Sequence, residues 1–171
     1  MVVEPVSSIP TTMFRTRSAV LDRDGLAALV PADEPGPGPS ADAVDRLVRE
    51  FFRTSGMPEV IVVRDDWLLA VEHVHHLRGL LYALYVEANA PLPAMGIKQW
   101  STKLTAAQRA VLSGLPTSAT SVAELADAHV RVGAAFLRVA RPLAGTWPTA
   151  LEDAARSHVR DVLGIDEPYP G

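Results

Sequence analysis

Four titratable side chains lie close together in one segment: Glu72, His73, His75 and His76. On a helix, Glu72 and His76 share a face because they are four residues apart, and His73 and His76 share one because they are three apart. A histidine beside a carboxylate can act as a general acid or base near neutral pH. A metal site would need three or four ligands, and the chain has neither a cysteine nor an HExxH motif. We therefore expect proton transfer and no metal.

The face that carries Glu72 and His76 continues with two small residues, Gly79 and Ala83, and then with Glu87. The small side chains leave room for a ligand, so we predict a cavity with His76, Glu72 and Glu87 as catalytic candidates. A neighbouring strip adds four candidate substrate-binding residues: His75, Arg78, Tyr82 and Tyr85. The alternative is that Glu72 and His76 form a solvated ion pair, while Gly79 and Ala83 let another helix approach closely.

These side chains must be positioned by a long helix, which we predict from residue 65 to residue 89. Its apolar residues recur at helical spacing and form one stripe that should face the core. The stripe contains Trp67, Val71, Val74, Leu77, Leu81, Leu84 and Ala88. The helix should therefore have one side in the core and another at the predicted cavity.

Capping residues mark the starts of other helices. Ser40 is placed to cap the first, and Thr105 with Gln108 and Ser121 with Glu124 have the spacing of capping boxes. Together with a closing glycine at position 164, these signals predict four further helices, at residues 40–54, 105–114, 121–141 and 149–163.

The connections complete the expected fold. Residues 59–63 form a β-branched run that favours a strand, but the run is short and leads straight into the long helix, so we favour a helix there. Residues 1–39 should form an irregular arm, with a short strand at 18–21, and a linker rich in proline and glycine. Residues 40–171 should form an all-α, up-and-down bundle of four to five helices.

Composition excludes several classes of protein. The chain has 171 residues, enough for one domain with a sizeable core, and 48% of them are hydrophobic. A net charge of −4 makes nucleic acid and anionic membranes unexpected partners. No segment reaches the roughly 18 apolar residues that a membrane span requires, and the start has no secretion leader. We expect a cytoplasmic protein that uses no cofactor.

Several segments follow one another in a familiar order: VLDRDGL, EFF, VVRDDWLLAVEHVHHLRGLLYALYVEANAP and GIKQWSTKLTAAQRAVLSGL. Over residues 19–163 this pattern resembles the C-terminal half of aminoglycoside nucleotidyltransferases and their small-molecule nucleotidyltransferase relatives. The resemblance implies a helical bundle that binds a hydroxylated amine and can supply an acidic residue as base. Asp66, Lys98 and Trp100, which lie in the matching segments, are added as candidate substrate-binding residues.

The chain departs from that family at its start. The Gly-Ser loop and paired metal-binding aspartates of the catalytic domain are missing, and Asp22 and Asp24 fit an ordinary turn. Nucleotidyl transfer by this chain alone is therefore not expected. We expect a stand-alone domain that binds a small polar or amine-bearing molecule. The same domain can have been repurposed as a cyclase, isomerase or hydrolase in specialised metabolism or antibiotic resistance. The alternative is a non-enzymatic subunit that completes a separate nucleotidyltransferase chain or forms a homodimer.

Overall fold

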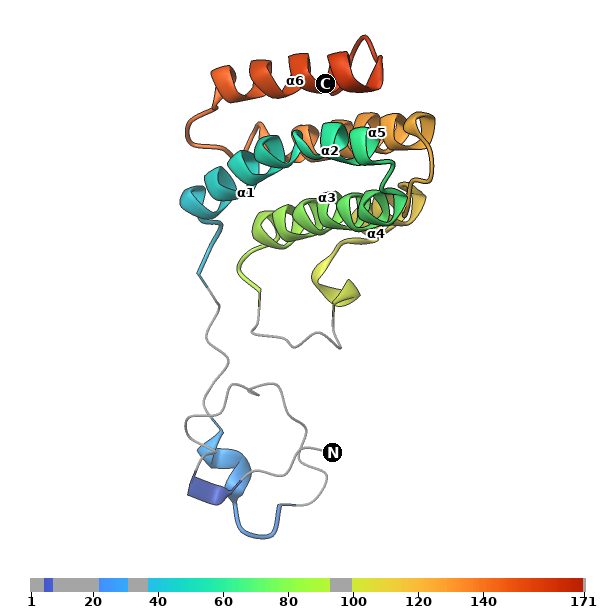
Figure 1. The fold of residues 1–171 in the computed structure, drawn as a ribbon. Coiled ribbons are helices and arrows are strands. Elements are labelled where there is room, and N and C mark those ends of the chain that lie inside the picture. Colours follow the sequence, from blue (N-terminus) through green and yellow to red (C-terminus); the bar gives the residue numbers. More distant parts are fainter. Residues whose placement is uncertain (1–4, 8–21, 31–36, 93–99, 171) are drawn as a thin grey trace.

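All regular structure in the described residues is helical. The computed structural model describes residues 5–7, 22–30, 37–92 and 100–170. The α-helices are α1 (Ala41–Thr54), α2 (Met57–Arg64), α3 (Trp67–Ala88), α4 (Ala106–Gly114), α5 (Val122–Ala140) and α6 (Thr149–Leu163). Two short 3-10 helices are η2 (Leu26–Leu29) and η4 (Ser101–Lys103). The predicted all-α bundle is confirmed, whereas the strand predicted at 18–21 lies outside the described residues (Figure 1).

Side chains begin the helices much as their spacing predicts. The Ser40 hydroxyl accepts the backbone N–H of Ala43 at 3.2 Å and starts α1. Thr105 and Gln108 form a complete capping box at the start of α4. Each of these contacts satisfies an N–H that has no partner within its own helix.

The second predicted capping box is only half formed. Ser121 caps α5 by accepting the backbone N–H of Glu124 at 3.3 Å. The Glu124 carboxylate, however, accepts the backbone N–H and the hydroxyl of Thr120, at 2.7 and 2.8 Å, and does not return to Ser121. The Glu124 carboxylate therefore binds Thr120, one residue before the N-cap, and the second hydrogen bond of the capping box does not form.

The β-branched run at 59–63 lies inside a helix, α2, as favoured from its length. Asp65 ends α2 in the left-handed conformation, with φ of 52°. The next residue, Asp66, is the N-cap of α3 and its carboxylate accepts the N–H of Leu69 at 3.0 Å. The long helix thus begins two residues later than predicted. Asp66 was a candidate substrate-binding residue, but its side chain caps this helix.

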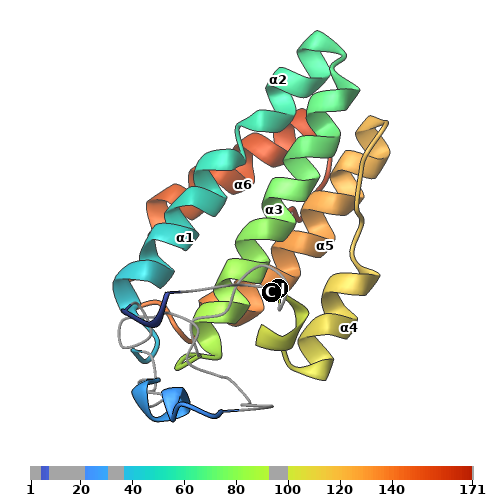
Figure 2. The ribbon, with the colours of Figure 1, turned by 90° about the horizontal axis from the view of Figure 1, so that it is seen from below.

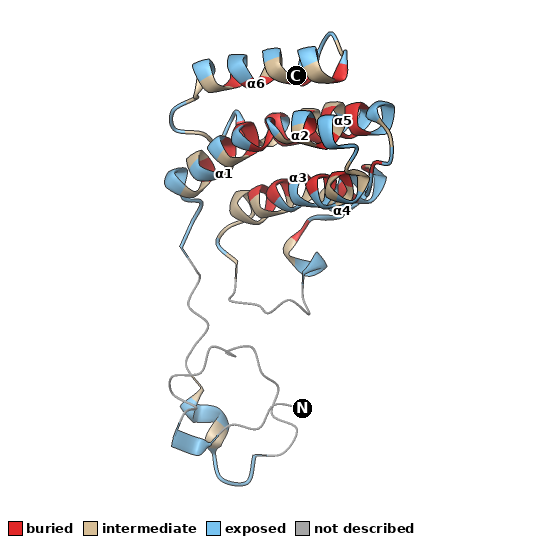
Figure 3. Cartoon of the chain, in the orientation of Figure 1, coloured by how far each residue is buried: buried red, intermediate tan, exposed pale blue. Residues whose placement is uncertain are grey.

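Helix α3 is the centre of the bundle. It packs against α5 on one side and α1 on the other, with α2 and α4 as further neighbours (Figure 2). The predicted stripe supplies four fully buried side chains: Val74, Leu77, Leu81 and Leu84. A second buried line, including Ala70 and His73, follows the same helix (Figure 3). Apolar contact on two sides fixes the helix firmly, so its polar side chains are held in place by the core.

The C-terminal segment closes the core. Tyr169 is fully buried, its ring lies edge-on to Phe51 at 5.6 Å, and its hydroxyl is 2.7 Å from Ser55 Oγ. The ring lies over Gly133 of α5, where an added Cβ would come within 2.3 Å of the tyrosine Cδ1. The absence of a side chain at Gly133 is what lets the tyrosine enter.

The sequence predicts an ordinary turn at Asp22 and Asp24. The Asp22 carboxylate accepts the backbone N–H groups of Leu26 and Ala27, both at 2.8 Å, which agrees with a turn at this position.

Across the described ranges, none of the helices combines the length and the apolar character needed to cross a bilayer.

Candidate functional site

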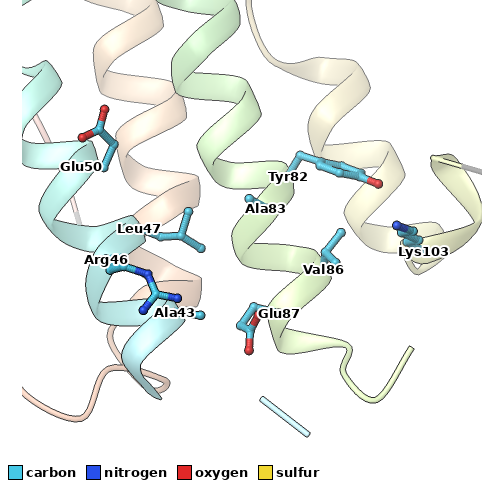
Figure 4. Close-up of a pocket in the computed structure, with 9 residues that line it drawn as sticks. All are labelled: Ala43, Arg46, Leu47, Glu50, Tyr82, Ala83, Val86, Glu87 and Lys103. Carbon is cyan, nitrogen blue, oxygen red and sulfur yellow. The ribbon is translucent and has the colours of Figure 1, made fainter. Parts of the chain in front are cut away.

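Two hollows lie side by side in the groove between α1 and α3, and Glu50 lines both. The first, which we call the histidine hollow, has a volume of about 310 Å³ and is lined by Glu50, Arg53, Thr54, Gly56, Met57, Leu69, Glu72, His73 and His76. The second, the tyrosine hollow, has a volume of about 510 Å³ and is lined by Ala43, Arg46, Leu47, Glu50, Tyr82, Ala83, Val86, Glu87 and Lys103 (Figure 4). The polar face of α3 therefore borders two hollows, whereas the sequence predicted a single cavity.

His76 pairs with a carboxylate of another helix. Its Nε2 lies 3.5 Å from Oε1 of Glu50, which projects from α1. Glu50 is also held by Arg53, whose Nε and Nη2 donate to its two oxygens at 2.7 and 2.6 Å. The hydrogen bond and charge of Arg53, aided by His76, outweigh partial burial and lower the pKa of Glu50. Glu50 therefore stays ionised beside an imidazole that is half exposed.

Glu72 makes no ion pair or side-chain hydrogen bond with any part of the chain that the structure describes. The solvated Glu72–His76 ion pair, one of the two sequence-based alternatives, is not formed. Both residues line the histidine hollow, but the carboxylate that meets His76 belongs to Glu50. Sequence reasoning missed Glu50; the signal that it offered was the Glu-x-x-Arg spacing with Arg53.

His73 lies at the buried side of the histidine hollow and contacts His129 of α5. Their Nε2 atoms are 2.8 Å apart and their rings stack with centroids at 5.0 Å. Burial lowers the pKa of His73 to about 4 and that of His129 to about 3, so both are neutral at pH 7. The described part of the chain contains no cluster of three or more His, Asp or Glu able to hold a metal ion.

The hydrogen bond between these imidazoles fixes where the protons lie. Nδ1 of His129 is buried and has no hydrogen-bond partner in the described part of the chain. A buried N–H without an acceptor costs more than a bare acceptor nitrogen, so the His129 proton belongs on Nε2 and is donated to His73. His73 then carries its own proton on Nδ1. The result is a neutral imidazole at the hollow whose tautomer is set by a residue behind it.

Glu87 does not join Glu72 and His76. It lines the tyrosine hollow, and its carboxylate accepts the backbone N–H of Ser40, the N-cap residue of α1. This contact ties the last turn of α3 to the first turn of α1. The three predicted catalytic residues are thus divided between two neighbouring hollows.

Tyr82 and Trp100 form a stacked pair beside the tyrosine hollow. Their ring centroids are 3.8 Å apart, the planes differ by 8°, and the Tyr82 hydroxyl donates to the Trp100 carbonyl at 3.0 Å. Tyr82 lines the hollow, and Trp100 is 46% exposed. The tyrosine is therefore held as an aromatic wall, with its hydroxyl already in use.

The sequence matches no protein family, no curated protein and no solved structure. The resemblance to nucleotidyltransferases therefore stays a prediction, and the site has to be judged on its own geometry.

The remaining candidates lie outside the hollows. Arg78 donates to the carbonyls of Leu115 and Pro116 at 2.9 and 3.1 Å, which fastens the connection between α4 and α5. Tyr85 is buried in the core. His75 is exposed and lines neither hollow.

One more candidate, Lys98, lies outside the described residues. Helical spacing alone placed His75, Arg78, Tyr82 and Tyr85 on a single strip. In the structure, three residues of that strip make structural contacts: Arg78 with the carbonyls of Leu115 and Pro116, Tyr82 with Trp100, and Tyr85 within the core.

Proposed function

We propose that this chain is a binding domain for a small polar, amine-bearing molecule, which it holds in the histidine hollow. The observation that carries the proposal is the carboxylate of Glu72, which has no partner among the described residues and lies beside the Glu50–His76 pair at a concave site. A carboxylate with no partner is the natural acceptor for an ammonium group. Because His73 is neutral and Glu50 is already balanced by Arg53, the charge left for a ligand to neutralise is that of Glu72.

The same hollow supports cofactor-independent acid/base chemistry. His76 is accessible and lies within reach of Glu50, so it can accept a proton while the carboxylate stabilises the imidazolium. Glu72 would then hold the amine, and His73 would donate a hydrogen bond from Nδ1. Isomerisation, cyclisation and hydrolysis all fit this set of groups. A role in specialised metabolism or antibiotic resistance, in the cytoplasm, and descent from a nucleotidyltransferase-like domain belong to the same proposal.

The binding proposal is tested with deoxystreptamine, a small ring that carries hydroxyls and two amines. Myo-inositol, a hydroxylated ring without an amine, is the matched control. We expect deoxystreptamine to shift the backbone NMR signals of Glu72, His73 and His76 saturably and myo-inositol to leave them unchanged. Glu72→Gln should weaken that binding about tenfold, because a charge-assisted hydrogen bond is lost.

Asp153→Asn, which removes an exposed carboxylate on α6, is the control for the lost charge. Equal weakening by Glu72→Gln and Asp153→Asn, or equal shifts with the two rings, would contradict an amine site in this hollow.

A second candidate function is that of a partner subunit. Val63 and Leu68, on either side of the turn between α2 and α3, are 79% and 82% exposed. Large apolar side chains that are this exposed are typical of a surface that contacts another chain, either a second copy or a nucleotidyltransferase chain. Replacing both by serine should convert a dimer to a monomer in light scattering. A wild-type chain that is monomeric at high concentration would remove the homodimer from consideration.

A further inference from the structure

Two cationic side chains line the tyrosine hollow and have no partner among the residues that the structure describes. Arg46 projects from α1 and Lys103 from η4, and they lie on opposite sides of the hollow (Figure 4). Within residues 37–92 and 100–170, neither cationic group forms an ion pair or a side-chain hydrogen bond. Two cations that line one hollow from different elements provide two positions at which an acidic ligand group can be held.

The carboxylates that line this hollow are already engaged. Glu50 is bound by Arg53 through two hydrogen bonds and also meets His76. Glu87 accepts the N–H of Ser40, at the positive end of α1. Glu50 is balanced by Arg53, and the two cations Arg46 and Lys103 outnumber the one remaining carboxylate, Glu87, so the lining keeps a positive excess.

The surface between the two cations is apolar. Leu47, Ala83 and Val86 line it, and the Tyr82 ring forms one wall. A free inorganic anion would use only the charged edges of such a surface. A ligand with an apolar stem that ends in an acidic group would use both the cations and the apolar lining.

We propose that the tyrosine hollow binds the acidic end, a carboxylate or a phosphate, of the same elongated molecule whose amine occupies the histidine hollow. This inference rests on the proposed function for the amine end. His76 and Ala83 mark the two hollows along α3 and are seven residues apart, which corresponds to roughly 10 Å at the helical rise. The ligand class is an extended molecule with an amine at one end and an acid at the other.

The test uses three probes that share one hydrocarbon chain: ε-aminocaproate, hexylamine and caproate. We expect caproate to shift the backbone NMR signals of Ala43 and Ala83, hexylamine to shift those of Glu72 and His76, and ε-aminocaproate to shift both sets. The two-ended probe should bind at least about tenfold more tightly than either one-ended probe, because its second contact forms within one complex. Hexyl phosphate in place of caproate distinguishes a phosphate from a carboxylate as the preferred acid.

Variants locate the acidic end. Arg46→Gln and Lys103→Gln should each weaken caproate about tenfold and leave hexylamine unchanged. Arg49→Gln removes an exposed cation from the same helix outside both hollows and should change nothing.

The outcomes separate the two proposals. If hexylamine shifts the histidine hollow while caproate leaves the tyrosine hollow unchanged, or if Arg46→Gln and Arg49→Gln weaken caproate equally, the acid subsite is overturned and the amine site stands. If hexylamine leaves the histidine hollow unchanged, the proposed function itself fails.

Discussion

The imidazoles of His73 and His129 are joined by a hydrogen bond of 2.8 Å between their Nε2 atoms, at the contact of α3 with α5. Two neutral histidines in a core are an uncommon way to join helices, because each would bind a proton readily in water. The pair holds His73 at the edge of the histidine hollow. It also makes the bundle sensitive to acid.

Acid should destabilise the bundle between about pH 6.5 and about pH 3. Burial lowers the pKa of His73 to about 4 and that of His129 to about 3, from an ordinary value of 6.5. As the pH falls below 6.5, these two histidines bind protons in the unfolded chain but stay neutral in the folded chain. The free energy of unfolding therefore decreases. Each pKa unit corresponds to about 1.4 kcal/mol for each histidine. Denaturant unfolding followed across this range measures the slope.

A double variant checks the origin of that acid sensitivity. His73→Leu with His129→Leu should remove most of the pH dependence, because both partners become apolar together. His75→Leu, at an exposed position, should keep the wild-type slope. The explanation fails if the double variant loses stability on acidification as steeply as the wild type.

Gly133→Ala should expel or displace the Tyr169 ring. The added methyl would lie 2.3 Å from the tyrosine Cδ1, so the free energy of unfolding should fall by roughly 2 kcal/mol. Gly79→Ala is the matched control, because no heavy atom lies within 4 Å of its added methyl and alanine favours a helix. That variant should gain roughly 0.5 kcal/mol in thermal or denaturant unfolding. Similar losses at the two positions would contradict the close approach seen at Gly133.

Glu152→Gln should destabilise the contact of α5 with α6. The carboxylate is 5% exposed and binds Arg141 and Arg156, each at 2.8 Å, and the indole N–H of Trp147 at 2.5 Å. Burial opposes its ionisation, but these hydrogen bonds and charges prevail and lower its pKa.

Neutralising Glu152 should cost roughly 2 kcal/mol of unfolding free energy, since it leaves a partly buried guanidinium without its counter-charge. Asp153→Asn, on the next and exposed residue, should cost almost nothing in the same measurement. A Glu152→Gln protein as stable as the Asp153→Asn protein would show that the cluster contributes little.

Glu87 should prove to be a structural residue at the start of α1. Glu87→Ala removes the acceptor of the Ser40 N–H and should cost roughly 1 kcal/mol, whereas Glu87→Gln keeps an acceptor and should cost less. Chemical denaturation of both variants measures the difference. If Glu87→Gln is as unstable as Glu87→Ala, the negative charge at the N-terminus of α1 matters more than the hydrogen bond.

Local sequence alone determined where most helices begin and end and which side of α3 enters the core. Ser40 and Thr105 cap helices where predicted, α6 occupies the predicted residues, and Val74 to Leu84 is buried at the predicted spacing. These features depend on contacts within about four residues along the chain, which spacing and residue type describe well. The half-formed box at Ser121 shows the limit, since a nearby threonine competed for the carboxylate.

Only the tertiary structure decided the partners across helices. His76 meets Glu50 in place of Glu72, His73 meets His129, and the Glu87 carboxylate is taken by the start of α1. Helical spacing says which residues share a face of one helix, but the partner of that face depends on how whole helices cross and on the sum of many apolar contacts. That packing split the predicted catalytic face into two hollows.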